Sequence, residues 1–333
     1  MIKIKIAING FGRIGRVFLR ALLQRKIKGI EVVAINHSQG PESAAYLFQH
    51  DSVYGMFPGK VSSTKDSLVI NGKRIKILTE RDPEKLPWKK LKVDVVIEST
   101  GAFTDTPGAS KHLKAGAKRV VISAPSKDNQ CPTIILGVNE NKIKKSDKVI
   151  SLGSCTTNCL APVIKVLNDE FGIERAFFNT IHAYTNDQSL QDSFHRKTRR
   201  GRAASRNIVP TNSGASISVE KAIPEIKGKM SGLAIRVPVI CGSITDLTAE
   251  LKKPFTVEKI NSVFKKYSRE KMKNILEYSE DELVSTDIIG NPKSSVIDGL
   301  STMKDGNLVK ILAWYDNEYG YSNRLVDFLV RIK

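Results

Sequence analysis

A glycine-rich turn close to the N-terminus constrains the fold more than any other feature. Its spacing is G-x-G-x-x-G, and it stands between an expected strand, Ile2–Ile8, and an expected helix, Arg16–Lys26. In that context the glycines allow a tight turn, and the first turn of the helix presents amide donors to an anionic group. A glycine-rich turn without a ligand is the alternative. The three glycines are Gly10, Gly12 and Gly15.

Strands and helices continue to alternate as far as residue 154. A second strand is expected at Glu31–Asn36, which completes one βαβ unit. Val93–Glu98 and Arg119–Ser123 are almost continuously apolar, as is typical of parallel strands covered on both faces, and a helix is expected between them at 111–118. Residues 1–154 are therefore predicted to form a Rossmann-type, doubly wound α/β sheet that binds a dinucleotide.

The pattern changes after residue 154. A helix is expected at Thr156–Asn168 and a longer one near Thr256–Lys271, among strands that do not alternate regularly with helices. Residues 155–320 are therefore predicted to form an α+β catalytic and substrate-binding domain. The final helix, at 321–333, is expected to pack back on the first domain.

The charge of the chain raises a competing class of function. Lys and Arg number 53 against 34 Asp and Glu, a formal net charge of +19. Such an excess invites a nucleic-acid-binding interpretation. The basic residues are spread along the whole chain, however, so we favour a lysine-rich solvated surface and disfavour nucleic acid as a partner. The densest group, at 195–202, is placed where anionic substrate or cofactor is expected.

Composition also limits location and metal chemistry. No stretch approaches the roughly 20 apolar residues that a membrane span needs, and the N-terminus lacks the pattern of a signal peptide. Four cysteines in so long a chain do not suggest a disulfide scaffold. We therefore expect a cytoplasmic protein. No clustered His and Cys residues have the spacing of a zinc site, so no bound metal is expected.

The candidate nucleophile is Cys155, in Ser-Cys-Thr-Thr-Asn-Cys at 154–159. This segment joins the end of a strand to the start of a helix, where the helix dipole and free amides stabilise a thiolate. A buried structural cysteine is the alternative, which the polar neighbours of Cys155 disfavour. His182, at the end of an expected strand, is either a general base for that thiol or a packed core histidine.

Five motifs, in order along nearly the whole chain, resemble the phosphorylating glyceraldehyde-3-phosphate dehydrogenase family. They are INGFGRIGR at 8–16, SCTTNCLAP at 154–162, HAYTNDQ at 182–188, RVPV at 236–239 and WYDNEYGYSNR at 314–324. The resemblance implies that Cys155 attacks the aldehyde and forms a thioester, with His182 as the base during hydride transfer to NAD or NADP. Inorganic phosphate then releases 1,3-bisphosphoglycerate. A homotetramer, in glycolysis or gluconeogenesis, is also implied.

The resemblance assigns further residues to binding sites. Thr185 and Arg236 match the site for the substrate phosphate. The site for attacking inorganic phosphate is matched by Ser154, Thr156, Arg202, Ser213 and Gly214. The cofactor contacts are matched by Gly10, Gly12, Arg13, Ile14, Gly15, Arg81 and Ser123, and Asn317 matches the residue that orients the nicotinamide amide.

Three departures bear on these expectations. His37 stands where NAD-using members have Asp, so nothing there repels a 2′-phosphate, and His37 and Ser38 are candidates to bind one. Ser193-Phe194 replaces a Leu-Pro pair common in NAD-using relatives. Asn212-Ser213-Gly214 replaces Thr-Thr-Gly but keeps a hydroxyl. NADP use is thus a hypothesis, and erythrose-4-phosphate dehydrogenase, a relative that releases an acid, is the rival activity.

Overall fold

The computed structural model describes residues 4–333, so the start of the strand expected from Ile2 lies outside the described residues. Two compact units make up the chain, and each is described by itself. The first contains residues up to Ile134, Asn141–Gly153 and Ser322–Lys333. The second contains Ile135–Glu140 and Ser154–Tyr321.

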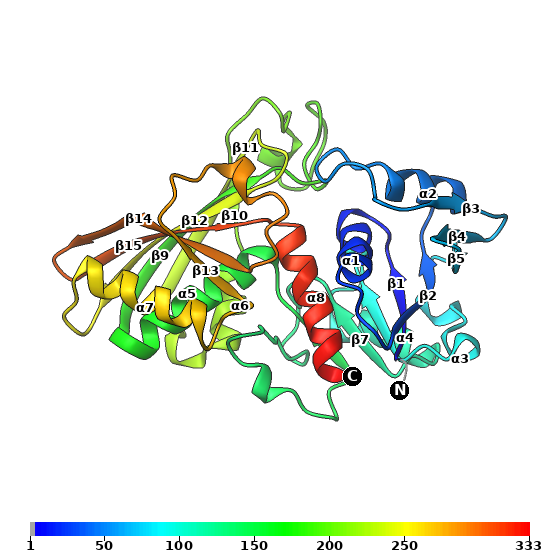
Figure 1. The fold of residues 1–333 in the computed structure, drawn as a ribbon, viewed down its shortest axis with the longest axis horizontal. Coiled ribbons are helices and arrows are strands. Elements are labelled where there is room, and N and C mark those ends of the chain that lie inside the picture. The colour runs from blue at the N-terminus through cyan, green and yellow to red at the C-terminus, as the bar shows by residue number, and fades with distance from the viewer. Residues whose placement is uncertain (1–3) are drawn as a thin grey trace. The chain divides into compact units, whose positions relative to one another are not determined.

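An eight-stranded sheet forms the centre of the first unit, with the strand order β3-β4-β5-β2-β1-β6-β7-β8 (Figure 1). The strands are β1 Ile4–Asn9, β2 Ile30–Asn36, β3 Val61–Ser63, β4 Ser67–Ile70, β5 Lys73–Leu78, β6 Val95–Glu98, β7 Arg119–Ile122 and β8 Val149–Ser151. All pairs from β5 to β8 are parallel. The strand order reverses beside β1, which places the carboxyl ends of β2, β1 and β6 side by side. Ligands of open α/β sheets bind at such a switch point.

The helices of the first unit are α1 Arg13–Gln24, α2 Pro41–Gln49, α3 Trp88–Leu91 and α4 Thr106–Lys114. Two of them differ from expectation. The glycine turn is shorter than expected, so α1 begins three residues earlier. Helix α4 begins at the Asp105 cap, whose carboxylate accepts from Gly108 N at 2.7 Å. It ends before Gly116, which has a φ of +104° that ordinary residues rarely adopt.

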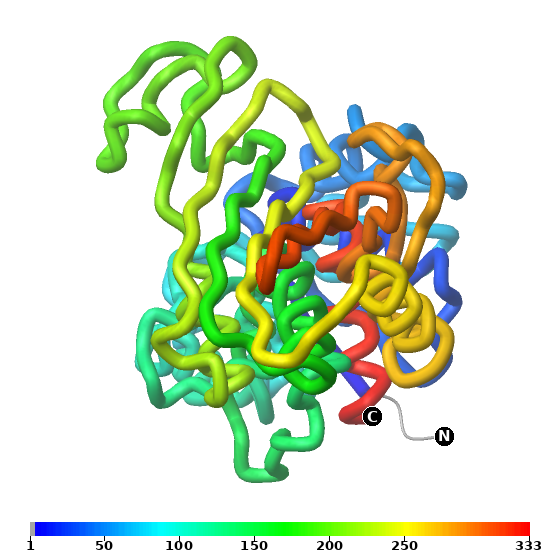
Figure 2. The backbone as a smooth tube through the Cα atoms, turned by 90° about the vertical axis from the view of Figure 1, so that its left-hand side faces the viewer, coloured from blue at the N-terminus to red at the C-terminus, as the bar shows by residue number. Residues whose placement is uncertain are grey.

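A seven-stranded sheet forms the second unit, with the order β10-β11-β9-β12-β15-β14-β13. The strands are β9 Ile173–Ala183, β10 Val209–Asn212, β11 Met230–Val237, β12 Ser243–Leu251, β13 Leu276–Ser279, β14 Ser295–Asp305 and β15 Leu308–Tyr315. Helix α5 Cys155–Phe171 packs on the central strands, and α7 Val257–Arg269 packs beside it on β13 and β14, as Figures 1 and 2 show. The remaining helix of this unit is α6 Ala215–Ala222, while α8 Tyr319–Ile332 belongs, from Ser322 on, to the first unit.

The expected fold class is confirmed: a doubly wound N-terminal sheet is followed by an α+β unit. The core of the first unit is apolar on both faces of its sheet, with Ala7, Val96 and Val120 among its fully buried residues. The segment from Asn186 to Asn207 is a long loop, as expected, apart from one short 3-10 turn at Thr198–Gly201. Among the described residues no helix is long and apolar enough to cross a membrane.

Candidate active site

Cys155 is the first residue of α5 in the second unit. Ser154 caps the helix: its hydroxyl accepts from Thr157 N at 3.1 Å, and Thr157 Oγ1 accepts from Ser154 N at 3.2 Å. This capping box fixes the backbone that carries the thiol. Removal from water raises the pKa of the Cys155 thiol and outweighs the positive charge of Arg236. Burial thus opposes the stabilisation of a thiolate that the position of Cys155 at the start of a helix alone suggests.

His182 stands near the end of β9 and faces that thiol. Its Nε2 lies 3.4 Å from Cys155 Sγ, and the ring is 2% exposed. Burial, and then the charge of Arg236, lower the His182 pKa to about 3. The imidazole is neutral at physiological pH. Nδ1 lies 2.6 Å from Ala183 O, and in the tautomer that donates its Nδ1 proton to that carbonyl, Nε2 directs a lone pair at the sulfur.

Arg236 lies beside His182 because strands β9 and β11 pair in parallel with these two residues in register. Its Nη1 donates to Ala183 O at 2.9 Å, lies 2.8 Å from His182 Nδ1 and reaches Thr185 Oγ1 at 3.5 Å. Its Nε is buried and makes no hydrogen bond with the described residues. A buried cation with an unused donor is suited to an anionic ligand.

Tyr315, at the end of β15, supports the same cluster and was not anticipated from the sequence. Its hydroxyl bonds Thr180 Oγ1 at 2.6 Å and Thr156 Oγ1 at 3.0 Å, and its ring packs edge-on against His182. The hydroxyl of Thr156 is therefore hydrogen-bonded within the protein. The position of Tyr315 in the WYDNEYGYSNR motif is the one sequence signal that pointed to it.

Two arginines of the 186–207 loop take different positions. Arg202, which the family match assigned to phosphate, has a largely exposed side chain that pairs with Asp192 at 2.7 Å. Arg200 forms an ion pair with Asp187 and donates to Thr211 Oγ1 at 2.9 Å. Its charge acts on both His182 and Arg236. Arg200 thus lies closer than Arg202 to the catalytic cluster of Cys155, His182 and Arg236. The spacing of the arginines within residues 195–202 does not predict this difference.

The remaining residues expected to bind phosphate stand at a helix start. Ser213 and Gly214 lead into α6, where Ser213 Oγ accepts from Ala215 N at 3.2 Å. A Cβ added at Gly214 would meet nothing within 4 Å, so its backbone is accessible. Amides at a helix start attract anions.

The glycine turn of the first unit has the form that a dinucleotide requires. Gly10 has a φ of +95°, and a Cβ there would lie 2.7 Å from the backbone of Ser99. At Gly12, which begins α1 without a side-chain cap, a Cβ would project into open space. A side chain at Gly12 would occupy the space in which a pyrophosphate approaches the first turn of α1. The turn therefore fits the cofactor.

The other residues expected to contact the cofactor differ in exposure and in their bonding partners. Arg13 forms an ion pair with Asp51 at 2.6 Å. His37 follows the end of β2; its Nε2 is buried without a hydrogen-bond partner among the described residues, and burial followed by the charge of Arg16 lowers its pKa. Ser38 and Arg81 are exposed. Ser123 follows β7, and Ile14 lies in the first turn of α1.

Asn317, in the second unit, has a fixed side-chain orientation. Its Oδ1 accepts from Ser243 Oγ at 2.9 Å and from Gly242 N at 3.2 Å. The amide nitrogen is then the end left to contact a ligand. Among residues 4–333 no group of three or more His, Cys, Asp or Glu side chains could hold a metal ion.

Comparison with known proteins identifies the family. One family model, described as "Glyceraldehyde 3-phosphate dehydrogenase, NAD binding domain", matches residues 4–106, and another, "Glyceraldehyde 3-phosphate dehydrogenase, C-terminal domain", matches residues 154–317. Proteins named glyceraldehyde-3-phosphate dehydrogenase from Mycobacterium avium and Geobacillus stearothermophilus are each 51% identical to this chain, over 99% of it and 98% of their own length. A protein of the same name from Priestia megaterium is 52% identical over 97% of the chain and 96% of its own length. The chain thus belongs to the glyceraldehyde 3-phosphate dehydrogenase family.

Proposed function

We propose that this chain catalyses the reversible, phosphorylating oxidation of glyceraldehyde 3-phosphate to 1,3-bisphosphoglycerate through a thioester on Cys155. Membership of the family makes it an NAD- or NADP-dependent oxidoreductase that oxidises glyceraldehyde 3-phosphate. The observation that carries the assignment of residues is the 3.4 Å separation between Cys155 Sγ and His182 Nε2, with the imidazole held neutral.

The first step follows from the protonation states. Because Cys155 is a thiol and His182 a neutral base, the thiol proton passes to Nε2 as the sulfur bonds to the aldehyde carbon. That proton then moves to the former aldehyde oxygen, which gives a thiohemiacetal and leaves Nε2 able to accept again.

Oxidation and release use the same two residues. NAD or NADP, when bound, supplies the hydride acceptor. His182 takes the hydroxyl proton of the thiohemiacetal as the carbon is oxidised, and the product is a thioester. Attack of inorganic phosphate on the thioester carbon breaks the carbon–sulfur bond and releases the acyl phosphate, with the thiolate as leaving group.

Anion binding divides between two groups of residues in the second unit. Arg236 and Thr185 bind the phosphate of the substrate, which is supported by the unpartnered Nε of Arg236. The start of α6 at Ser213 and Gly214, with Ser154 and Thr156, binds the attacking phosphate, whereas Arg202, which the family match assigned to this site, is left out because its exposed side chain pairs with Asp192. We add Arg200 to the anion-binding residues, because its positive charge acts on His182 and Arg236.

The cofactor is bound through the Gly10–Gly15 turn, Arg81 and Ser123, and Asn317 orients the nicotinamide amide. NADP is accepted as well as NAD, because no carboxylate follows β2 and the unpartnered Nε2 of His37, together with Ser38, can bond a 2′-phosphate.

Assembly and location are proposed from family membership and from the surface. Leu190 and Phe194 of the 186–207 loop, and Ile208 just after it, are exposed apolar side chains that a neighbouring copy would cover. A homotetramer in the cytoplasm is the assembly and place that we propose. Light scattering after size-exclusion chromatography tests the first, and a monomer at micromolar concentration would contradict it.

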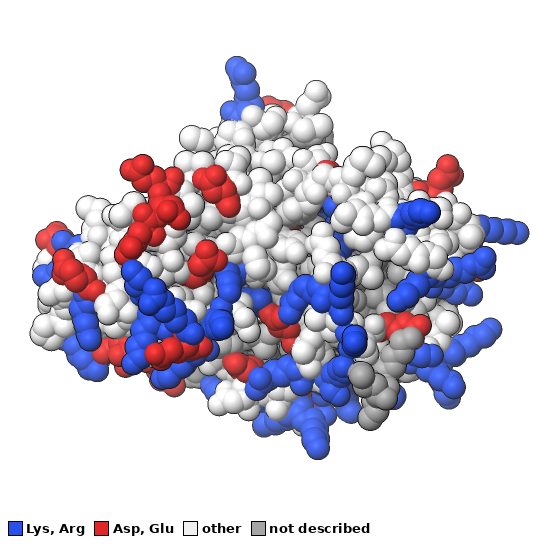
Figure 3. Space-filling model, viewed as in Figure 1, with Lys and Arg blue, Asp and Glu red and all other residues white. Residues whose placement is uncertain are grey.

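The charges over α7 do not favour a nucleic-acid function for that face. Basic and acidic side chains are intermingled over α7, as Figure 3 shows, where Lys265 pairs with Glu280. Such mixed charge is typical of a solvated face rather than of a basic groove.

The proposal is tested by steady-state kinetics. We expect that the reduction of NAD or NADP with glyceraldehyde 3-phosphate needs added inorganic phosphate. The measurement compares kcat/KM for the two cofactors in parallel. Sustained turnover without phosphate, with erythrose 4-phosphate as the better substrate, would support the rival erythrose-4-phosphate dehydrogenase instead. No activity with either aldehyde would contradict the proposed function.

A further inference from the structure

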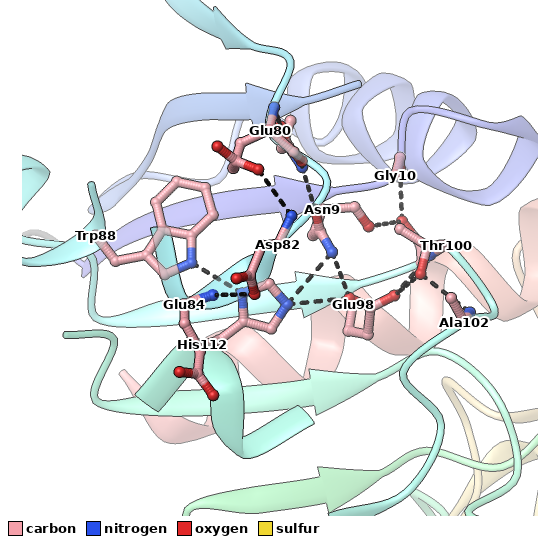
Figure 4. A network of polar contacts seen from close by, with 12 residues as sticks. Asn9, Gly10, Glu80, Asp82, Glu84, Trp88, Glu98, Thr100, Ala102 and His112 are labelled. Atoms are coloured by element: carbon pink, nitrogen blue, oxygen red, sulfur yellow. Dashed lines mark hydrogen bonds and ion pairs between the residues drawn. The ribbon is translucent and has the colours of Figure 1, made fainter. Parts of the chain in front are cut away.

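A second buried histidine lies in the first unit, in a polar network beneath the glycine turn (Figure 4). His112, on α4, is fully buried, and so are the side chains around it. Trp88 Nε1 donates to His112 Nδ1 at 2.9 Å, and His112 Nε2 lies 3.1 Å from Glu98 Oε2. Asn9 Nδ2 donates to the same carboxylate oxygen at 2.6 Å. The catalytic residues do not use this network.

The chemistry of tryptophan determines the protonation of His112. An indole N–H is only a donor, so His112 Nδ1 must accept and carries no proton. The single ring proton is then on Nε2, which donates to Glu98. Trp88 thus selects one neutral tautomer and leaves no site at which a second proton can bind without breaking the indole bond.

Glu98 is the acceptor at the centre of the network. Besides His112 and Asn9, it accepts from Thr100 N at 2.8 Å and from Thr100 Oγ1. These donors satisfy the buried carboxylate oxygens and fix the orientation of the side chain. Because His112 is neutral, its Nε2–H is one donor among several and not the charged half of an ion pair.

The network joins the carboxyl ends of three adjacent strands. Asn9, Asn36 and Glu98 are the last residues of β1, β2 and β6. Asn36 Nδ2 donates to Asn9 Oδ1 at 2.7 Å and to Glu80 O at 2.7 Å, so the loop after β5 is included. These strand ends form the switch point at which the cofactor binds.

The same residues hold the glycine turn. Ser99 Oγ donates to Gly10 O at 2.6 Å, and the space for a side chain at Gly10 is occupied by the backbone of Ser99 and Thr100. Thr100 is tied to Glu98 through both its amide and its hydroxyl. The position of the turn therefore depends on where Glu98 is held, and Glu98 is held by Asn9 and His112.

We propose that Trp88 and His112 are positioning residues for the cofactor: the indole N–H bonds His112 Nδ1 and so selects the Nε2–H tautomer, and this keeps Glu98, Asn9 and the Gly10 turn set for dinucleotide binding. The inference concerns binding and rests on the family's use of NAD or NADP. It does not depend on the chemistry at Cys155.

Other charges around His112 are too peripheral to replace this control. The charged residues on the elements that pack against it are Glu98 on β6, Glu84 and Lys85 on the 3-10 turn at Pro83–Lys85, Lys89 and Lys90 on α3, Arg119 on β7, and Lys111 and Lys114 on α4 itself. Of these, Glu98 bonds the ring, while Lys114 and Glu84 pair with each other at 2.9 Å on the surface.

The test removes the indole donor without removing the ring. In Trp88→Phe, His112 Nδ1 becomes free to bind a proton, and the charged imidazolium draws Glu98 away from Asn9 and Thr100. We expect the dissociation constant for NAD, measured by calorimetry on the full chain, to rise about three- to tenfold from pH 8 to pH 6. This is the change in affinity expected from the loss of one buried hydrogen bond. The unaltered protein is expected to show no such rise.

Two variants make the result specific. Trp88→Phe/His112→Gln carries an amide that donates to Glu98 and does not titrate, so the added pH dependence should disappear. Trp314→Phe removes the other indole of the chain, whose Nε1 donates to Asp298 at 3.1 Å in the second unit, and should bind NAD like the unaltered protein.

Three outcomes overturn the inference: a flat pH profile in Trp88→Phe, a pH dependence that persists in the double variant, or the same dependence in Trp314→Phe. Failure to oxidise glyceraldehyde 3-phosphate would contradict the proposed function instead. The dependence of NAD affinity on pH could still be measured in that case. If Trp88→Phe does not fold, His112→Gln alone is expected to keep NAD affinity within about twofold, because its amide can accept from Trp88 and donate to Glu98. A larger loss in His112→Gln would contradict the inference.

Discussion

His182 and His112 are both buried histidines at the carboxyl-terminal side of a parallel strand pair, yet their surroundings prepare them for opposite tasks. His182 has a lone pair directed at a thiol 3.4 Å away and a cation beside it. His112 has one nitrogen bonded to an indole and the other to a carboxylate. The first ring is left with an acceptor that can take a proton, whereas the second has both nitrogens committed.

The difference shows that burial alone does not mark a histidine as catalytic or structural. What separates the two is whether a ring nitrogen faces a group that can exchange a proton. The neighbouring charge differs as well, since Arg236 opposes protonation of His182 while Glu98 is bonded to His112. The comparison predicts that changes around His182 affect the chemistry and spare cofactor binding, while changes around His112 do the reverse.

The largest effect is expected from Cys155→Ser. A serine hydroxyl is a far weaker nucleophile next to a neutral imidazole, so kcat should fall by about 10⁴-fold or more. The dissociation constant for NAD, measured by calorimetry, should change by less than about twofold. Retention of a substantial fraction of kcat would show that Cys155 does not carry the covalent intermediate.

His182→Asn should reduce kcat by about 10²- to 10⁴-fold, the contribution of a positioned general base. The asparagine keeps a polar group near Arg236, so the fold should persist. Alkylation of Cys155 by iodoacetamide at pH 7 should also slow, because the thiol loses its proton acceptor while its pKa stays raised by burial. Equal alkylation rates in the two proteins would contradict the assignment of His182 as the base.

Replacement of His37 by Asp tests the cofactor choice. The added carboxylate would repel a 2′-phosphate and bond a 2′-hydroxyl, so the ratio of kcat/KM for NADP to that for NAD should fall by about 10- to 100-fold. His37→Gln keeps the neutral polar character and serves as the matched control. An unchanged ratio in His37→Asp would show that this position does not face the 2′-group.

The sequence predicted the chemistry-bearing elements well where a motif fixes backbone geometry. Because turns and caps depend on local residues, the start of α5 lies where expected, and the glycine turn follows β1 as expected, although α1 begins three residues earlier, at Arg13. It did not predict helix α2. It also did not predict the bond between Tyr315 and Thr180, because that contact depends on the pairing of β15 and β9 with β12.

The Arg-rich loop shows the same limit, and a pair of variants measures it. Arg200→Gln should raise KM for glyceraldehyde 3-phosphate or for inorganic phosphate about tenfold, because its charge acts on Arg236 and His182. Arg202→Gln, which removes an exposed ion pair with Asp192, should change either KM by less than about twofold. The reverse order would restore the assignment made from the family match alone.

The smallest effect concerns stability against pH. The folded-state pKa of His182 is lowered to about 3, so below its ordinary value of 6.5 the unfolded chain binds a proton that the folded chain does not. The free energy of unfolding should therefore fall as the pH drops from 6.5 towards 3, and be unaffected by this group above 6.5. His182→Asn removes the contribution and should lessen that fall in urea titrations at pH 7, 5.5 and 4.5. Parallel slopes for His182→Asn and the unaltered protein would mean that His182 is not held neutral by its surroundings, and the contrast between the two histidines would then rest on geometry alone.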